Sequence, residues 1–314
     1  MNHRVLGRTG LRVSVVAFGA GPVSGLMTGD DAALQLATVE RAVAAGVNWF
    51  DTAAGYGDGR SEANLGRVLA DLGTADRVHV ATKVRVPAEH LDDPADAIAR
   101  SVRDSLARLR LPRVALLQLH NGVTARHGDE ANAVTPADVL RAGGILAGLE
   151  RVKADGLARF VGLTGTGHPA ALREVIRAGG FDTVQSPFNL LNPSAGRTGG
   201  AAGGDADYGN VFADCAATGV GVFAIRVFAG GALLGRPPSA HTLRTPYFPL
   251  PLYERDAARA AALRSDLPMP VLALRFALAH PAVCSAIVGF GSPADVDAAT
   301  SGGPDGPLQA DPGP

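Results

Sequence analysis

Cysteine is nearly absent from this chain, with only Cys215 and Cys284 among 314 residues. The two lie in dissimilar contexts, so we expect buried free thiols in a reducing cytoplasm rather than a disulfide bridge. Long apolar runs are missing too: none is long enough to span a bilayer. Nothing behind Met1 resembles a signal peptide. These absences predict a cytoplasmic protein without a membrane partner.

An excess of charge of either sign is also missing. The chain carries 29 basic and 30 acidic residues, a formal net charge of −1, so charge gives no reason to expect binding to nucleic acid or an anionic membrane. Hydrophobic residues, in contrast, make up 46% of the chain, which indicates a globular protein with an ample core. Glycine and proline concentrate at 196–209 and 301–314. The second segment has too little to bury, and we expect residues 301–314 to be a disordered tail.

Strand-like and helix-like segments alternate along most of the chain. Residues 4–6 and 11–13 flank the turn sequence Gly-Arg-Thr-Gly and predict an N-terminal β-hairpin. Strands are then expected at 13–18, 47–50, 77–82, 114–119, 160–163, 183–185, 219–225 and 285–288. Helices are expected at 32–45, 61–72, 94–109, 145–153, 169–177, 211–217, 253–264, 271–279 and 293–299. The helix at 61–72 is expected to open at Ser61 and to close at Gly73.

This alternation favours a parallel sheet covered by helices. Eight strand–helix units in about 250–300 residues are typical of a barrel rather than of an open sheet with a second domain. Composition does not change between the two halves of the chain. The sequence therefore predicts an α/β fold, a (β/α)8 TIM barrel with an N-terminal β-hairpin, as a single domain over residues 1–300.

A glycine-rich segment, residues 19–25, follows the first of these strands. Its sequence, Gly-Ala-Gly-Pro-Val-Ser-Gly, is a loose match to the dinucleotide fingerprint of an open, doubly wound sheet. Two features count against a Rossmann site: residues 26–30 delay the helix that the motif needs at once, and Pro22 removes an amide that should face phosphate. A glycine-lined loop at the mouth of a barrel is the favoured interpretation.

Ionisable side chains end three consecutive predicted strands. Asp51 ends the first of them, and Tyr56 follows in its loop; Lys83 ends the second. His120 ends the third. Because the carboxyl ends of parallel barrel strands lie at one face, we expect these four side chains to converge. Their types fit acid–base chemistry, since a lysine held by an aspartate stabilises a tyrosine phenolate and a histidine can orient a carbonyl.

Each of these residues also has a purely structural explanation. Asp51 can cap its loop, Lys83 can extend toward solvent, and His120 can be a satisfied core histidine. His127 follows His120 by seven residues and has acidic neighbours, a combination that could suggest a metal site. The spacing of ligands is wrong and a second cluster is missing, so no metal site is expected.

The residues around this set resemble the aldo-keto reductase superfamily. Its motifs occur here in the family's order and at its spacing. The first are Asp51-Thr52-Ala53, Tyr56-Gly57, Ser61-Glu62, Leu65-Gly66, Lys83 and His120. The segments 162–165, 181–191, 219–235 and 289–293 follow. The resemblance spans about residues 3–300. It implies a barrel that binds NADP or NAD in extended form across the carboxyl face of the strands, without a Rossmann domain, and a small carbonyl or alcohol substrate.

The resemblance also implies roles for individual residues. Tyr56 would be the proton donor, Lys83 and Asp51 its tuning pair, and His120 the residue that orients the carbonyl. The matching cofactor-binding positions are Gly19, Asp51, Thr164, Gln185, Arg226, Gly289, Gly291 and Ser292. The implied reaction is hydride transfer between the nicotinamide and an aldehyde, ketone or aldose, with Tyr56 as general acid or base.

Three positions depart from the family pattern. Gly165 stands where an amide side chain is frequent, and Arg226 replaces a small polar residue and could reach a cofactor phosphate or an acidic substrate. Asp295 stands where NADP-selective members carry a basic residue, and no lysine or arginine follows Gly289. Such an acid would repel a 2′-phosphate, which leaves NAD plausible beside the NADP that family prevalence favours.

A second class of function stays open at this point. Some barrels of this family are cofactor-binding regulatory subunits of channels, with little turnover and a partner protein. A complete set of Asp51, Tyr56, Lys83 and His120 argues for the enzyme. Substrate selection is expected to rest on the loops 20–30, 121–143, 192–210 and 236–252. The oligomeric state is not predicted.

Overall fold

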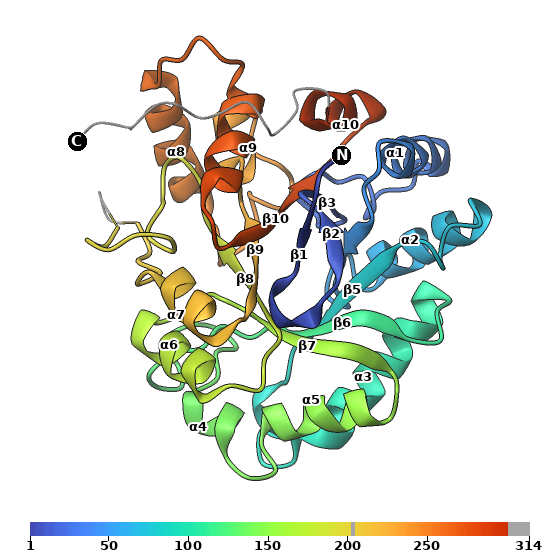
Figure 1. Ribbon diagram of the computed structural model, residues 1–314, viewed down its shortest axis with the longest axis vertical. Helices are drawn as coiled ribbons and strands as arrows, with labels where there is room; N and C mark the ends of the chain where they lie inside the picture. The colour runs from blue at the N-terminus through green and yellow to red at the C-terminus, as the bar shows by residue number, and fades with distance from the viewer. Residues whose placement is uncertain (202–204, 301–314) are drawn as a thin grey trace.

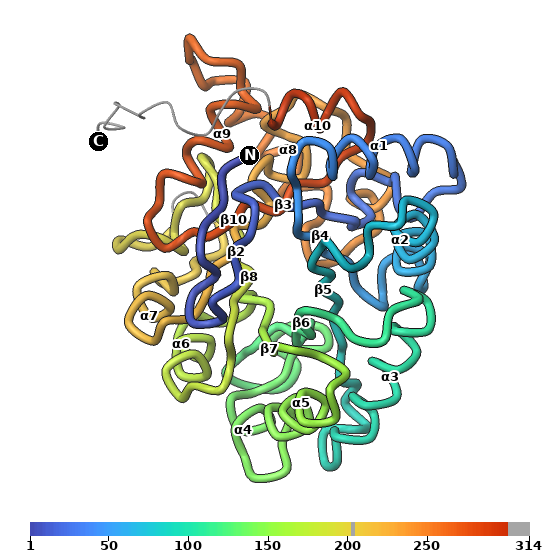
Figure 2. Tube along the Cα trace, turned by 45° about the vertical axis from the view of Figure 1, so that its right-hand side comes forward, coloured from blue at the N-terminus to red at the C-terminus, as the bar shows by residue number. Residues whose placement is uncertain are grey.

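The computed structural model describes residues 1–201 and 205–300. Within them, eight parallel strands close into a barrel in the order β10-β3-β4-β5-β6-β7-β8-β9, and the helices surround it (Figures 1 and 2). The strands are β1 (His3–Val5), β2 (Arg12–Ser14), β3 (Val16–Gly19), β4 (Trp49–Asp51), β5 (His79–Val84), β6 (Val114–Leu119), β7 (Ala158–Thr164), β8 (Thr183–Pro187), β9 (Gly221–Ile225) and β10 (Val283–Gly289). The predicted TIM barrel and its N-terminal β-hairpin are confirmed.

The helices follow the strands in sequence order. The α-helices are α1 (Ala32–Ala44), α2 (Arg60–Asp71), α3 (Pro94–Leu109), α4 (Pro136–Leu140), α5 (Ile145–Ala154), α6 (Pro169–Ala178), α7 (Val211–Thr218), α8 (Leu250–Ala262), α9 (Met269–Ala279) and α10 (Pro293–Thr300). Short 3-10 turns are η1 (Gly7–Thr9), η2 (Ala88–His90) and η3 (Ala229–Leu234).

Helix α3 has the bounds that its sequence predicts. Pro94 stands at the first helical position, where its missing N–H costs nothing. The apolar positions Ile98, Val102, Leu106 and Leu109 repeat at three- and four-residue steps, and all are buried. Arg110, in the left-handed conformation, ends the helix.

The β1–β2 hairpin closes the N-terminal end of the barrel. The Arg8 amide donates to the carbonyl of Gly219 at 2.7 Å, and Arg4 Nη1 donates to the carbonyl of Val283 at 2.7 Å, so the hairpin is bonded to residues at or just before the starts of two strands. Leu6 belongs to an apolar cluster with Trp49 and other strand residues. With this end filled, the opposite end, where the strands terminate, is left for ligands.

Several predicted element ends are displaced by a few residues, and two of the differences have a clear structural reason. The expected strand at 13–18 is two strands, β2 and β3, because the chain leaves the hairpin at Val15 before it enters the barrel. Ser61 does not open helix α2; Gly59, in the left-handed conformation, is the N-cap, and Ser61 lies inside the first turn. Its hydroxyl donates instead to the carbonyl of Ala20 at 2.8 Å.

Other differences concern segments read as loops. The loop predicted at 121–143 contains α4, which a Thr135 capping box starts, and η3 follows β9. That residues 1–300 form one domain stays a prediction. The predicted disordered tail, 301–314, lies outside the described residues.

The glycines at 19–21 belong to a barrel, as the sequence favoured. Gly19 is the last residue of β3 and pairs in register with Asp51 on one side and Gly289 on the other. Helix α1 begins only at Ala32, far from where a Rossmann motif needs its helix. Among the described helices, none is both long and apolar enough to cross a bilayer.

Candidate active site

Polar side chains replace apolar ones along the barrel interior toward the carboxyl ends of the strands. Successive side chains of a strand alternate between its two faces, so residues two apart share a face. Trp49 belongs to the apolar cluster at the hairpin end, and Asp51, two residues on, is the last residue of β4. Leu116 and Gln118 have the same relation in β6. The polar cluster therefore lies directly above the apolar floor.

Lys83 of β5 is the centre of this cluster. Its Nζ donates to Asp51 Oδ1 at 2.5 Å, to the carbonyl of Thr52 at 2.8 Å and to the Tyr56 hydroxyl at 3.2 Å. Its side chain is only 2% exposed. Burial lowers the pKa of Lys83, but the neighbouring Asp51 and Tyr56 raise it by more, so its pKa lies above the usual value. The amine is therefore a cation with an acceptor for each of its three N–H bonds.

Asp51 accepts hydrogen bonds from two glutamines as well as from Lys83. Gln118 Nε2 donates to Asp51 Oδ2 at 3.2 Å, and Gln185 Nε2, from β8, donates to the same oxygen. The carboxylate is thereby fixed by donors from three strands. Gln118 was missed by the sequence reasoning. Its signal was a lone amide inside an apolar strand, two residues before His120 and hence on the same face.

Tyr56 and His120 stand against each other. Their ring centroids are 5.7 Å apart with an interplanar angle of 80°, an edge-to-face contact. Burial, and then the cations of Lys83 and Arg85, hold the pKa of His120 well below its usual value. The imidazole is therefore neutral near pH 7 and can present an N–H without carrying charge. The four predicted catalytic residues are brought together at one place.

A second set of bonds fixes the loop that carries Tyr56. The Thr52 and Ser61 hydroxyls lie 2.8 Å apart. Glu62 is fully buried, accepts a hydrogen bond from the Thr82 hydroxyl at 2.5 Å, and accepts another from Arg108 Nε at 2.7 Å. These contacts join the start of α2 to Thr52, to β5 and to α3. The loop that carries Tyr56 is therefore fixed where it enters α2.

The predicted cofactor-binding residues fall into two groups. Thr164 is in register with Gln185, which bonds Asp51, and the buried Oγ1 of Thr164 has no hydrogen-bond partner in the described chain. Such an orphaned hydroxyl fits a polar group of a ligand. A side chain at Gly165 would come within 2.9 Å of Val184, so the barrel wall leaves room for glycine alone.

The second group lies at the end of β10. The Gly291 amide donates to Asp295 Oδ2 at 2.8 Å, and the Asp295 amide donates to Ser292 Oγ at 3.3 Å. Arg236 forms a salt bridge with Asp295, its Nη1 lying 3.4 Å from Oδ2. Although no basic residue follows Gly289 in sequence, one is brought to this loop from the segment after η3.

Arg226 follows directly on β9. It stands at the carboxyl end of the barrel with a side chain 15% exposed and a left-handed backbone, φ 54°. Its side-chain contacts within the described residues are with Asp256 and Phe248 rather than with the Lys83 cluster. The predicted site residues whose side chains contact one another are Asp51, Tyr56, Lys83, His120 and Gln185.

A closed parallel barrel that gathers ionisable side chains at the carboxyl ends of its strands has the arrangement of a barrel enzyme's active site. Residues 15–301 match the model of the Aldo/keto reductase family. The chain therefore belongs to the aldo/keto reductase family, and the resemblance read from its motifs is confirmed.

Individual relatives agree with this assignment. The chain is 30% identical to an L-galactose dehydrogenase of Arabidopsis thaliana over 94% of its own length and 85% of the relative's. It is 29% identical to a D-threo-aldose 1-dehydrogenase of a Pseudomonas species, with coverages of 91% and 88%.

Solved structures share the fold. An aldo-keto reductase of Bacillus halodurans in its holo form superposes with a TM-score of 0.71 at 24% identity, covering 99% of this chain and 92% of that one. An aldo-keto reductase of Klebsiella pneumoniae in complex with NADPH superposes with a TM-score of 0.66 at 18% identity, covering 96% and 89%.

Proposed function

We propose that this protein catalyses hydride transfer between a nicotinamide dinucleotide and a small carbonyl or alcohol substrate. The observation that carries the proposal is the contact of Lys83 Nζ with both Asp51 and the Tyr56 hydroxyl. A buried cation at this distance favours the phenolate form of a tyrosine, which suits Tyr56 to exchange a proton with a substrate oxygen.

The chain's own residues then have distinct tasks. In the reducing direction Tyr56 gives its hydroxyl proton to the carbonyl oxygen, and the Lys83 cation stabilises the phenolate that is left. The neutral imidazole of His120, held edge-on to Tyr56, orients that oxygen with an N–H. In the oxidising direction Tyr56 takes the proton of the alcohol. The bound dinucleotide supplies or accepts the hydride.

The mouth of the barrel fits a nicotinamide group. The partnerless Thr164 hydroxyl and the amide of Gln185 lie next to each other, and both can bond a carboxamide. We propose Gly19, Gly289, Gly291 and Ser292 as the backbone that borders the remainder of the cofactor. Asp295 is paired with Arg236, so it does not present an isolated negative charge there. This pairing supports NADP as the cofactor, with NAD as the alternative.

The names of the relatives supply a substrate class. Since two relatives that match along most of the chain are named sugar dehydrogenases, we propose aldoses among the substrates, beside simple aldehydes and ketones. The test follows the absorbance of the nicotinamide cofactor while the protein is incubated with a panel of these compounds. Each dinucleotide is tried in the reducing and in the oxidising direction.

The decisive variant is Tyr56→Phe. It removes the proton that moves while leaving the ring against His120, so kcat should fall about 10²- to 10⁴-fold. Dinucleotide affinity, measured by calorimetry, should change less than twofold. A variant that turns over as fast as the wild type would sink the proposed mechanism. Dinucleotide binding without turnover of any panel compound, together with co-purification of a partner protein, would favour the regulatory subunit.

A further inference from the structure

Arg226 is a largely buried cation with a fixed backbone. Its left-handed conformation is uncommon for a residue with a side chain, and such outliers concentrate at functional sites. The surrounding structure maintains it: Asn189 Nδ2 donates to the Arg226 carbonyl at 2.9 Å, and the Ala229 amide donates to the same oxygen at 2.7 Å. The guanidinium is thereby held in one region at the mouth of the barrel.

The partners of this guanidinium are few. Its Cζ lies 3.9 Å from the centroid of the Phe248 ring, so one face is stacked. The carboxylate of Asp256 is 3.9 Å from Nη2, too far for a hydrogen bond. Among the described residues none accepts a hydrogen bond from it. The N–H groups of this largely buried cation are therefore left to water or to a ligand for their hydrogen bonds.

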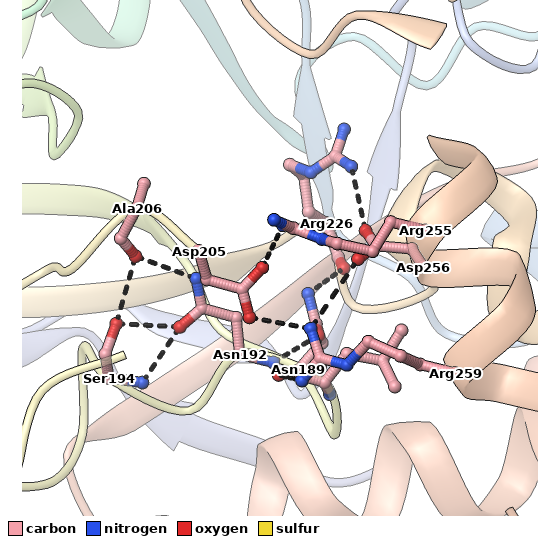
Figure 3. A network of polar contacts seen from close by, with 10 residues as sticks. Asn189, Asn192, Ser194, Asp205, Ala206, Arg226, Arg255, Asp256 and Arg259 are labelled. Atoms are coloured by element: carbon pink, nitrogen blue, oxygen red, sulfur yellow. Dashed lines mark hydrogen bonds and ion pairs between the residues drawn. The ribbon is translucent and has the colours of Figure 1, made fainter. Parts of the chain in front are cut away.

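The neighbouring charges do not compensate for it. Figure 3 shows that Asp205 is held by Arg255 and Arg259, the latter at 2.7 Å. Asp256 is shared between Arg226 and Arg259, at 3.9 Å from each. Three arginines therefore face two aspartates.

Nearby Tyr208 cannot supply the missing negative charge. Burial raises its pKa to about 12, so the phenol stays neutral near pH 7. The one positive charge in excess belongs to the arginine that makes only the long contact.

We propose that Arg226 binds an anionic group of a ligand, taking two oxygens of a phosphate or a carboxylate. The planar guanidinium presents parallel N–H groups to such oxygen pairs, and its stacking on Phe248 fixes their plane. At Gly230 a side chain would stand 3.5 Å from Nη1, and glycine keeps that side open. The anion would come from the dinucleotide's pyrophosphate or from an acidic substrate, and this part of the inference rests on the proposed function.

Calorimetry on the purified chain tests the site. The probes are inorganic pyrophosphate, NADPH and NADH, titrated into the wild type, Arg226→Gln, Arg226→Lys and the control Arg151→Gln. Arg151 is an exposed arginine paired with Asp96 at 3.2 Å, so its replacement removes the same charge elsewhere. Arg226→Gln should weaken pyrophosphate at least fivefold, Arg226→Lys by less, and Arg151→Gln by less than twofold.

The source of the anion follows from two further comparisons. If it is the cofactor, Arg226→Gln weakens dinucleotide binding at least tenfold. If it is the substrate, dinucleotide affinity is kept, while the KM for glyoxylate rises at least tenfold and that for the uncharged glycolaldehyde does not.

Other outcomes refute the site or only the proposed function. Unchanged values for all of these probes in Arg226→Gln, with a thermal unfolding curve like that of the wild type, overturn the inference. If Arg226→Gln does not fold, Arg226→Lys is the deciding variant. The inference is overturned if Arg226→Lys binds pyrophosphate and the dinucleotides as tightly as the wild type and keeps the wild-type ratio of the KM values for glyoxylate and glycolaldehyde. Absent turnover in the wild type would refute the proposed function alone, because pyrophosphate binding needs no reaction.

Discussion

Lys83 has its three N–H bonds directed at three oxygens, one of which is the hydroxyl of Tyr56, the proposed proton donor. The same amine therefore holds Asp51 in place, ties the loop through the carbonyl of Thr52, and contacts the hydroxyl of Tyr56. Structural stability and chemistry rest on the same side chain, so changes here should affect both.

Replacement of the lysine alone should be more harmful than replacement of the pair. Lys83→Met leaves the Asp51 carboxylate buried without its cation, which typically costs about 3–5 kcal/mol of unfolding free energy. The double variant Lys83→Met/Asp51→Asn removes that uncompensated charge and should recover part of the loss, although neither variant should be active. Urea unfolding measures the difference. Equal stabilities for the single and double variants would contradict this account.

At the scale of elements, helix α2 packs on α3 at Gly66. A side chain there would come within 2.4 Å of the Leu109 carbonyl oxygen, which is backbone and cannot move aside. The family motif Leu65-Gly66 thus has a structural reason, the close approach of two helices. The sequence placed these helices well, and it misplaced only the start of α2. Ser61 looked like an N-cap because hydroxyl residues usually cap helices, whereas here it bonds across to Ala20.

Gly66→Ala should push α2 away from α3 and destabilise the protein by about 1–3 kcal/mol, the usual range for overpacking. The control is Gly73→Ala, just past the end of α2, where a side chain would meet nothing within 4 Å. Its positive φ should cost about 1 kcal/mol. Chemical denaturation of both variants compares the two glycines. A Gly66→Ala variant as stable as the wild type would show that the helices do not need this close approach.

At the scale of the whole molecule, features that follow from a local sequence pattern could be predicted, whereas contacts that depend on long-range packing could not. The convergence of Asp51, Lys83 and His120 was predictable, because each ends a strand and parallel strands end at one face. The bond of Gln185 to Asp51 joins residues 134 positions apart, and that of Arg236 to Asp295 spans 59. No local rule gives such pairs, since they depend on which strand and loop ends face each other across the barrel.

The stability of the whole protein should depend on pH through His120. Its pKa is lowered on folding by burial, so as pH falls below about 6.5 the unfolded chain takes up a proton that the folded chain does not. Unfolding free energy should therefore fall by up to about 1.4 kcal/mol per pH unit from this group alone. Burial also lowers the pKa of His79 and His241, which act in the same direction.

The difference between the wild type and His120→Gln isolates the one histidine. Urea unfolding between pH 7.5 and 5 should show a shallower loss of stability in His120→Gln. Parallel curves for the two proteins would mean that His120 titrates alike in the folded and unfolded chains.

The pairing of β3 with β10 has a consequence for synthesis on the ribosome. Residues 286–289 of β10 pair with residues 16–19 of β3. The first barrel strand to leave the exit tunnel therefore has no partner on this side until the last one has been synthesised. Until then a nascent chain holds an open sheet with two unpaired edges, which invites pairing with other chains. Gly19 and Gly289 pair only when that seam closes, so a truncated translation product would lack the proposed cofactor border at the mouth as well as the seam.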